Sequence, residues 1–253
     1  MAVNWNSYNA NVVPDAANSI TSTYGSATAF TYNTSTGYTP NVFASLGNGI
    51  VSFINGGSKG QIRVSGTKDP NNGDSVVGVG YPKYFTWVAR AKANSATDRA
   101  IEVEVALADA DADTSASRVK FVIGDNTLMQ GVQFDTIDGV SGTPANKPTV
   151  AVDTSQWHIY QVSIAMTDAT HGTVSLYVDG QLKTETTGGS ALPYSGVLNA
   201  ATGSLKRYLY VGTTGTNSYN GSLDWLVWTN QGAYSPAQIK GSLPAGLGDT
   251  TGY

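Results

Sequence analysis

Two glutamates stand two residues apart in the segment Glu102-Val103-Glu104. In a β-strand, residues i and i+2 share a face, and their Cα atoms lie about 6.6 Å apart. Carboxylates at this spacing could serve as the acid and the nucleophile of a glycoside hydrolase. The alternative is a solvent-facing pair on a strand whose Val103, Val105 and Leu107 pack inward, and we favour this second interpretation.

A second set of residues could move protons in a lyase. In such an enzyme a cation or amide neutralises the carboxylate of a uronate, and a tyrosine or histidine transfers the proton. Arg90, His158 and Tyr160 could supply these groups, with Lys120 and Gln133 on neighbouring strands. The other interpretation of His158 is a hydrogen-bonded group of the core, because it alternates in register with apolar residues.

Three aspartates, Asp109, Asp111 and Asp113, stand at positions i, i+2 and i+4. Hard cations such as calcium favour oxygen ligands in this kind of pattern. The run is not an EF-hand, since Thr114 and Lys120 occupy the positions of its glycine and its bidentate glutamate. It is either a loop that binds a structural calcium ion or an acidic, solvated turn. No glycine-rich phosphate loop precedes a helix, so we expect no organic cofactor.

Several aromatic residues have the pattern of a sugar-binding surface. Aromatic faces stack on the C–H faces of sugar rings, and neighbouring polar groups bind the hydroxyls. The candidates are Trp225, Tyr208, Tyr210, Arg207 and Tyr177. Large β-sandwiches also fill their cores with Tyr and Trp, so the argument rests on the group. As a group they favour a polysaccharide or an oligosaccharide as the partner.

The composition restricts the class of protein. The chain has 253 residues, of which 40% are hydrophobic and 13% charged, with a net charge of -4. Intrinsic disorder is excluded by the aromatic content, and nucleic acid is not expected as a partner because the basic residues are scattered. No apolar stretch reaches the roughly 20 residues of a membrane span, so we expect no membrane insertion. The absence of cysteine excludes disulfides and thiolate chemistry. Abundant Thr, Asn, Gly and Tyr are typical of a secreted or cell-surface bacterial β protein.

The elements that must position these residues are strands. Alternating apolar runs separated by turn residues predict strands over 49–54, 61–65, 84–93, 100–108, 118–123, 131–134, 158–166, 173–178, 208–212 and 222–229. Asp179-Gly180 predicts a two-residue type I′ hairpin turn. So many antiparallel strands without helical crossovers predict two packed sheets in one domain over 1–253, with 1–48 as edge strands and loops.

Four segments in order carry a resemblance to a known family. They are Trp157-His158-Ile159-Tyr160-Gln161-Val162, Val174-Ser175-Leu176-Tyr177-Val178-Asp179-Gly180, Gly221-Ser222-Leu223-Asp224-Trp225-Leu226-Val227-Trp228 and Tyr234-Ser235-Pro236-Ala237-Gln238-Ile239. The chain resembles the laminin-G-like branch of the concanavalin A-like lectin/glucanase superfamily. The resemblance implies an all-β jelly-roll sandwich of two curved antiparallel sheets, with a short helix near the C-terminus.

This resemblance leaves several functions open, because the fold hosts lectins, binding modules, hydrolases and lyases. Related glucanases carry Glu-x-Asp-x-x-Glu or a version one residue shorter, whereas here Glu104 replaces the Asp, and Ala106 and Leu107 stand at the third acidic position. The family implies a structural calcium near Asp224, whose parity with Leu226 and Trp228 predicts a half-buried side chain that needs a cationic or hydrogen-bonding partner. We therefore expect an extracellular module that binds a polysaccharide without cleaving it. A lyase or hydrolase, and an adhesion or structural module, are the alternatives.

Overall fold

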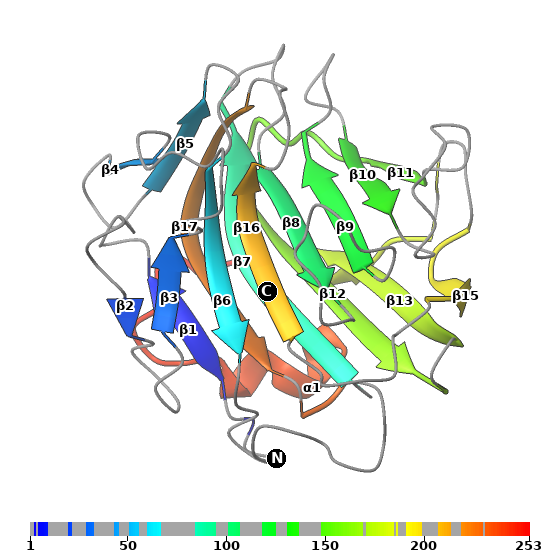
Figure 1. Ribbon diagram of the computed structural model, residues 1–253. Helices are drawn as coiled ribbons and strands as arrows, with labels where there is room; N and C mark the ends of the chain where they lie inside the picture. Colours follow the sequence, from blue (N-terminus) through cyan, green and yellow to red (C-terminus); the bar gives the residue numbers. More distant parts are fainter. Residues whose placement is uncertain are drawn as a thin grey trace.

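The structure is a computed structural model. It describes residues 3, 5–9, 20–21, 29–32, 43–45, 51–55, 60–66, 84–94, 101–106, 118–124, 131–136, 148–168, 171–184, 186, 191–198, 207–213, 219–229 and 231–253. Within these residues nearly all regular structure is strand, arranged in two antiparallel sheets (Figure 1). The run Asp109–Asp113, predicted to bind calcium, lies outside the described residues.

The first sheet has nine strands. Its path is β14-β13-β12-β7-β17-β5-β4, with β1 paired to β17 and β15 paired to β13. The bounds are β1 Asn6–Asn9, β4 Phe43–Ser45, β5 Val51–Asn55, β7 Tyr84–Ala93, β12 His158–Met166, β13 His171–Val178, β14 Gln181–Leu182, β15 Tyr194–Val197 and β17 Tyr219–Thr229.

The second sheet has eight strands in the order β11-β10-β9-β8-β16-β6-β3-β2. The bounds are β2 Ile20–Thr21, β3 Ala29–Tyr32, β6 Gly60–Gly66, β8 Ile101–Ala106, β9 Arg118–Ile123, β10 Gly131–Thr136, β11 Thr149–Ala151 and β16 Arg207–Thr213. Of the strands within 1–48, β2 and β4 end their sheet paths, whereas β3 lies between β6 and β2.

An apolar core, which we call the inner core, lies between the two sheets. The alternation of side chains along each strand puts every second residue into this core. Trp87 of β7 and Phe121 of β9 stack face to face across it, with ring centroids 4.8 Å apart. Ala89, Val103 and Tyr160 belong to the same cluster. The jelly-roll sandwich predicted from the sequence is thereby confirmed.

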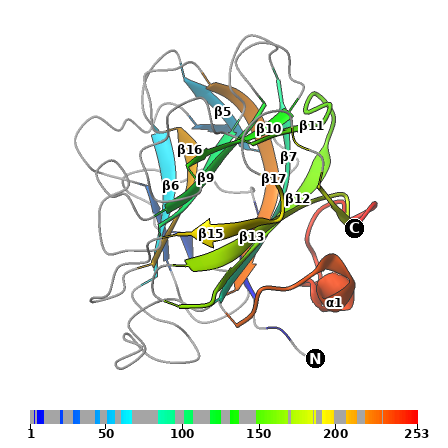
Figure 2. The ribbon, with the colours of Figure 1, turned by 90° about the vertical axis from the view of Figure 1, so that its right-hand side faces the viewer.

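The C-terminal residues 231–253, which we call the C-terminal strap, cover the other face of the nine-stranded sheet (Figure 2). The strap contains the helix α1 (Pro236–Ile239) and the 3-10 turn η3 (Lys240–Ser242). Proline suits the first position of a helix, and the side chain of Gln238 accepts a hydrogen bond from the backbone of Ser235. The short helix predicted near the C-terminus is confirmed, and no helix among the described residues could span a membrane.

Buried polar side chains fix the strap to the sheet. Gln161 and Ser163 of β12 both donate to the carbonyl oxygen of Tyr234, at 2.6 and 2.5 Å. Thr86 of β7 donates to the carbonyl oxygen of Gly232 at 2.8 Å, and the hydroxyl of Tyr253 donates to Gln161. Because buried polar groups are costly without partners, these bonds specify where the strap lies.

Candidate functional site

The eight-stranded sheet brings polar residues of six strands into line. We define three polar rows by the register of the strands, in which neighbouring residues are Cα partners (Figure 1). The first row is Thr136, Lys120, Glu104, Tyr210, Arg63 and Thr31. The second row is Gln133, Val122, Glu102, Gly212 and Gln61. The third row is Arg118, Ala106, Tyr208 and Ser65.

Apolar rows alternate with the polar rows. The row of Phe121, Val103, Val211 and Ile62 lies between the first and second polar rows. Phe121 and Val103 are 0% and 1% exposed, and both belong to the inner core. Successive residues of a strand face opposite sides of the sheet, so the polar rows hold the register of the face turned away from the nine-stranded sheet. Inward packing of Val103, predicted from the sequence, is confirmed.

The three polar rows unite residues that sequence analysis had assigned to different functions. Glu102 and Glu104, the hydrolase candidates, and Tyr208 and Tyr210, the sugar-binding candidates, occupy adjoining strands β8 and β16. The predicted spacing of the two glutamates on one strand is present. Arg207 begins β16 and has the parity of Leu209 and Val211, not that of the two tyrosines. The register therefore joins the glutamates and tyrosines, and it leaves Arg207 on the alternate parity.

Arg63 was not predicted as a site residue. Lys120 and Gln133 were predicted on strands beside the lyase candidates of β7 and β12, but they lie on β9 and β10 in the other sheet. Arg63 lies opposite Tyr210, and Lys120 lies opposite Glu104. Lys120 is 8% exposed and is the one charged residue among the buried side chains that the structure describes. The pairing of distant strands, which places Arg63 and Lys120 beside Tyr210 and Glu104, left no signal in the sequence.

The lyase set is not assembled. In the register of β7 and β12, Arg90 is the partner of Ile159, whereas Tyr160 is the partner of Ala89. Arg90 therefore lies on the strap side of the sheet, and Tyr160 lies in the inner core with 0% exposure. Burial raises the pKa of Tyr160 far above the ordinary range of a tyrosine. The prediction that Arg90 and Tyr160 act together is wrong, because they lie on opposite faces of one sheet.

His158, the first residue of β12, makes hydrogen bonds that connect this strand to two turns. Its Nδ1 lies 2.6 Å from a carboxylate oxygen of Asp179, and its Nε2 lies 2.9 Å from the carbonyl oxygen of Asp153. The second carboxylate oxygen of Asp179 accepts a bond from the backbone of Ile159 at 2.9 Å. Hydrogen bonds from Ser155 lower the pKa of Asp153. These contacts agree with the interpretation of His158 as a hydrogen-bonded group. The side chain is half-buried, however, and does not lie inside the core.

Asp224 has a protein cation as its partner. A bulge between Leu223 and Trp225 breaks the alternation of β17, so Asp224 does not share the side of Leu226 as predicted. Its carboxylate lies 2.7 Å from the Arg90 guanidinium. Burial raises the pKa of Asp224, and the bond from Arg90 partly offsets this effect. The expected need for a partner is met by arginine.

Further groups complete this cluster, which we call the Arg90 latch. The second guanidinium nitrogen of Arg90 lies 3.2 Å from Asp249 of the C-terminal strap. Trp157 lies beneath two cations, Arg90 at 4.5 Å and Lys92 at 5.4 Å from its ring centroid. Hydrogen bonds from Thr251 lower the pKa of Asp249. The Arg90 latch thus connects β7, β17 and the C-terminal strap, so its role is structural.

Trp225 and Tyr177 differ from the expected sugar-binding positions. Trp225 is 0% exposed, packs in the cluster beneath the strap, and donates from its indole to the carbonyl oxygen of Asp249 at 3.3 Å. Its ring therefore has no open face for a sugar, and the prediction for Trp225 is wrong in this arrangement. Tyr177 is half-buried on β13, in the other sheet from Tyr208 and Tyr210.

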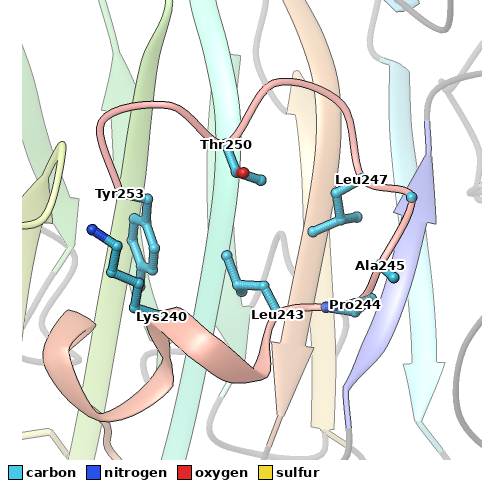
Figure 3. A pocket seen from close by; sticks show the side chains of 8 residues that line it. Lys240, Leu243, Pro244, Ala245, Leu247, Thr250 and Tyr253 are labelled. Atoms are coloured by element: carbon cyan, nitrogen blue, oxygen red, sulfur yellow. The ribbon is translucent and has the colours of Figure 1, made fainter.

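A separate hollow lies within the C-terminal strap. It has a volume of about 270 Å³. Figure 3 shows Leu243, Leu247 and Thr250 turned toward its centre, with Lys240 beside the ring of Tyr253. Its lining residues all belong to the strap itself. Among the described residues, no group of three acidic, histidine or cysteine side chains could hold a metal ion.

Comparisons with known proteins give fold-level likeness alone. No protein-family model matches the chain, and the comparison with curated proteins finds no match. A Bacillus licheniformis beta-glucanase is 16% identical, with a TM-score of 0.40 over 75% of this chain and 82% of that one. A native glycosidic hydrolase is 16% identical, with a TM-score of 0.43 over 91% and 92%. The binding domain of botulinum neurotoxin DC is 10% identical, with a TM-score of 0.45, and the match covers 78% of this chain but only 43% of that one.

Proposed function

We propose that the three polar rows of the eight-stranded sheet bind a polysaccharide or an oligosaccharide outside the cell. The observation that carries the proposal is the strand register, which brings Tyr208, Tyr210, Glu102, Glu104 and Arg63 to adjoining positions on β16, β8 and β6. Tyrosine rings offer apolar faces to sugar rings, while carboxylates and guanidinium groups bind hydroxyls.

Small residues separate the large ones in these rows. Gly212 lies between Glu102 and Gln61, and Ala106 lies between Arg118 and Tyr208. Neighbouring strands are about 4.8 Å apart, so three adjoining strands span roughly one to two sugar rings. This pattern favours an extended glycan bound across β8, β16 and β6.

The test is retention on a panel of neutral and uronate-containing polysaccharides, followed by gel retardation and calorimetry. We expect one glycan to bind saturably without product. Tyr210→Ala should weaken the affinity for this glycan by about tenfold or more, because the substitution removes one stacked aromatic contact. Tyr84→Ala is the matched control, because Tyr84 is 42% exposed and lies on the nine-stranded sheet. Equal affinity in Tyr210→Ala and the wild type would place the site elsewhere. A panel without any retention would favour the adhesion or structural alternative.

Hydrolysis is the second candidate, because Glu102 and Glu104 lie two residues apart on one strand. In a retaining reaction one carboxylate attacks the anomeric carbon while the other protonates the departing oxygen, and water later releases the sugar from the first. New reducing ends that disappear in Glu102→Gln and Glu104→Gln would establish this activity. Unsaturated-uronate absorbance that grows together with new reducing ends would instead indicate a lyase, because β-elimination also shortens the chain and frees ends without adding water. Silence in both assays, together with retention, supports binding alone.

A further inference from the structure

His158 makes two contacts that an uncharged histidine cannot make together. Its Nδ1 lies 2.6 Å from a carboxylate oxygen of Asp179, and its Nε2 lies 2.9 Å from the carbonyl oxygen of Asp153. A neutral imidazole carries one N–H group, so one of its nitrogens donates a hydrogen bond and the other accepts one. The imidazolium form donates from both nitrogens. The form of the ring therefore depends on whether each partner is a donor or an acceptor.

Both partners of the His158 ring are acceptors. A carbonyl oxygen has no proton to donate, and that of Asp153 also accepts a hydrogen bond from the backbone N–H of Gln156 at 3.2 Å. The other carboxylate oxygen of Asp179 accepts the backbone N–H of Ile159 at 2.9 Å. The pair of His158 and Asp179 must therefore hold one proton more than a neutral imidazole beside a carboxylate. Because an ordinary aspartic acid, with a pKa of about 3.9, is a stronger acid than an ordinary imidazolium, at about 6.5, this proton belongs to the ring.

We propose that His158 is an imidazolium ion in the folded protein at neutral pH, and that its two N–H groups connect β12 to two turns in a pH-sensitive way. Asp179 lies in the turn between β13 and β14, and Asp153 lies between β11 and β12. Loss of one proton leaves a single N–H group on the ring. The bond to the carboxylate of Asp179 is charge-assisted and therefore the stronger of the two. The contact with the carbonyl oxygen of Asp153 is the one that deprotonation breaks.

Residues 153–157 connect the His158 ring to the Arg90 latch. Asp153 begins this segment, and its carbonyl oxygen meets the His158 ring at 2.9 Å. Trp157 ends the segment, and its ring lies beneath the guanidinium of Arg90, 4.5 Å from the ring centroid. Deprotonation of His158 releases the start of the segment, whereas the neighbouring strands keep their own hydrogen bonds. The protonation of His158 is thus a pH-sensitive contact next to the latch.

The titratable groups next to the His158 ring, among the described residues, are two carboxylates and a phenol. Asp179 contacts the ring directly. Hydrogen bonds from Ser155 lower the pKa of Asp153, and the charge of His158 acts in the same direction. Tyr160 lies edge-on to His158, with ring centroids 6.0 Å apart, and burial raises its pKa far above the ordinary range. Both carboxylates favour the charged form of the ring.

The nearest basic side chains of the adjoining strand lie on the other face of the sheet. The register partner of His158 on β7 is Ala91, which is buried in the inner core. Arg90 and Lys92 flank Ala91, and successive residues of a strand point to opposite faces. Their charges are therefore separated from the His158 ring by the sheet itself, and they bind the ring of Trp157 instead.

The experiment is a long-range proton–nitrogen NMR spectrum of the nitrogen-labelled protein. The chain contains two histidines, His158 and His171, and His171→Gln assigns the signals by removing one set. The two nitrogens of an imidazolium resonate close together, whereas those of a neutral ring lie far apart. At pH 7 a histidine with the ordinary pKa of about 6.5 is roughly three-quarters neutral. We expect His158 to show mainly the imidazolium pattern at this pH, and a neutral pattern would overturn the proposal.

Asp179→Asn tests whether the carboxylate is the reason for the second proton. Asparagine tolerates the φ angle of 49° at this position, and its carbonyl oxygen can still accept the Ile159 N–H. Its NH2 group then donates to Nδ1, so His158 should become neutral at pH 7 and keep its proton on Nε2. Asp168→Asn is the matched control, because Asp168 lies 3.2 Å from Nδ1 of His171, and it should leave the His158 signals unchanged. An imidazolium pattern that survives in Asp179→Asn would contradict the proposal.

The melting temperature gives a second readout. A group that holds its proton more tightly in the folded chain stabilises it below the unfolded pKa of about 6.5, and this contribution is lost as the pH rises through the folded value. The wild type should therefore melt above Asp179→Asn by a few degrees at pH 5.5, and the gap should narrow toward pH 9. A gap that widens with pH would sink the proposed pH sensitivity. The wild-type spectra decide the charge state even if Asp179→Asn does not fold, and none of these measurements depends on a glycan.

Discussion

Arg90 contacts two carboxylates and an indole ring, and it is only 15% exposed. Arg90→Met removes the cation and leaves Asp224 half-buried without an opposite charge. We expect the free energy of unfolding to fall by about 2 kcal/mol, less than for a fully buried pair. Urea unfolding measures the change. Lys92→Met is the matched control, because Lys92 contacts the same ring, and it should cost under about 1 kcal/mol. Equal losses in the two variants would contradict the latch.

The Asp249 carboxylate makes the same latch sensitive to acid. Hydrogen bonds from Thr251 hold the pKa of Asp249 below its ordinary value of 3.8. A lowered folded pKa stabilises the protein above the unfolded pKa, and this contribution disappears as the pH falls through the folded value. Thr251→Val removes the hydroxyl, so its melting temperature should lie below that of the wild type at pH 6. Melts from pH 6 to 2.5 should show the gap closing below about pH 4; a constant gap would refute this mechanism.

Individual residues show where sequence reasoning ends. The partner of Asp224 could be anticipated as a cation, a backbone amide or an arginine, because a carboxylate of this kind needs one. The bulge between Leu223 and Trp225 could not be anticipated, and it puts Asp224 on the opposite side of the sheet from Leu226, where the same side was expected. Trp225 had the outward parity of a sugar-binding residue. The C-terminal strap covers that side of the sheet, and a covering segment leaves no trace in the strand's own pattern.

At the scale of elements, Gly248 lets the C-terminal strap approach the sheet. A Cβ atom at Gly248 would lie 2.6 Å from both carboxylate oxygens of Asp224. Since Asp224 is held by Arg90, Gly248→Ala must displace the strap or the ion pair. We expect a loss of about 1–3 kcal/mol in the free energy of unfolding. Gly241→Ala is the control, because a Cβ atom at Gly241 would meet nothing within 4 Å. A stability loss of similar size in Gly241→Ala would remove the steric explanation.

Strands with strong alternation were predictable from the sequence. The bounds of β7, β9 and β12 agree with the predicted ranges. The Asp179-Gly180 turn is also confirmed, with φ angles of 49° and 76° that define a type I′ turn. The short strands β11 and β15 were missed, because three or four residues are too few to establish a period. Register between distant strands was not predictable, and the candidate site depends on it.

At the scale of the whole molecule, calcium remains a prediction based on Asp109, Asp111 and Asp113. A bound ion adds RT ln(1 + [L]/Kd) to the stability of the folded protein. If the ion is present, removal with a chelator should lower the melting temperature by several degrees, roughly 2–3 kcal/mol at a hundredfold excess over Kd. Replacing all three aspartates by asparagine should abolish the response to chelator. A chelator response that survives in this variant would move the ion to another site.

The pairing of β1 with β17 joins residues near the two ends of the described chain. Asn6 lies opposite Trp228, and β17 also separates β7 from β5 at the centre of the nine-stranded sheet. During synthesis on the ribosome, β5 and β7 emerge long before the strand that must lie between them. Their unpaired edges are then open to other chains. Folding of this sheet should therefore wait until β17 has been made, and its yield should improve when synthesis is slowed or cooled.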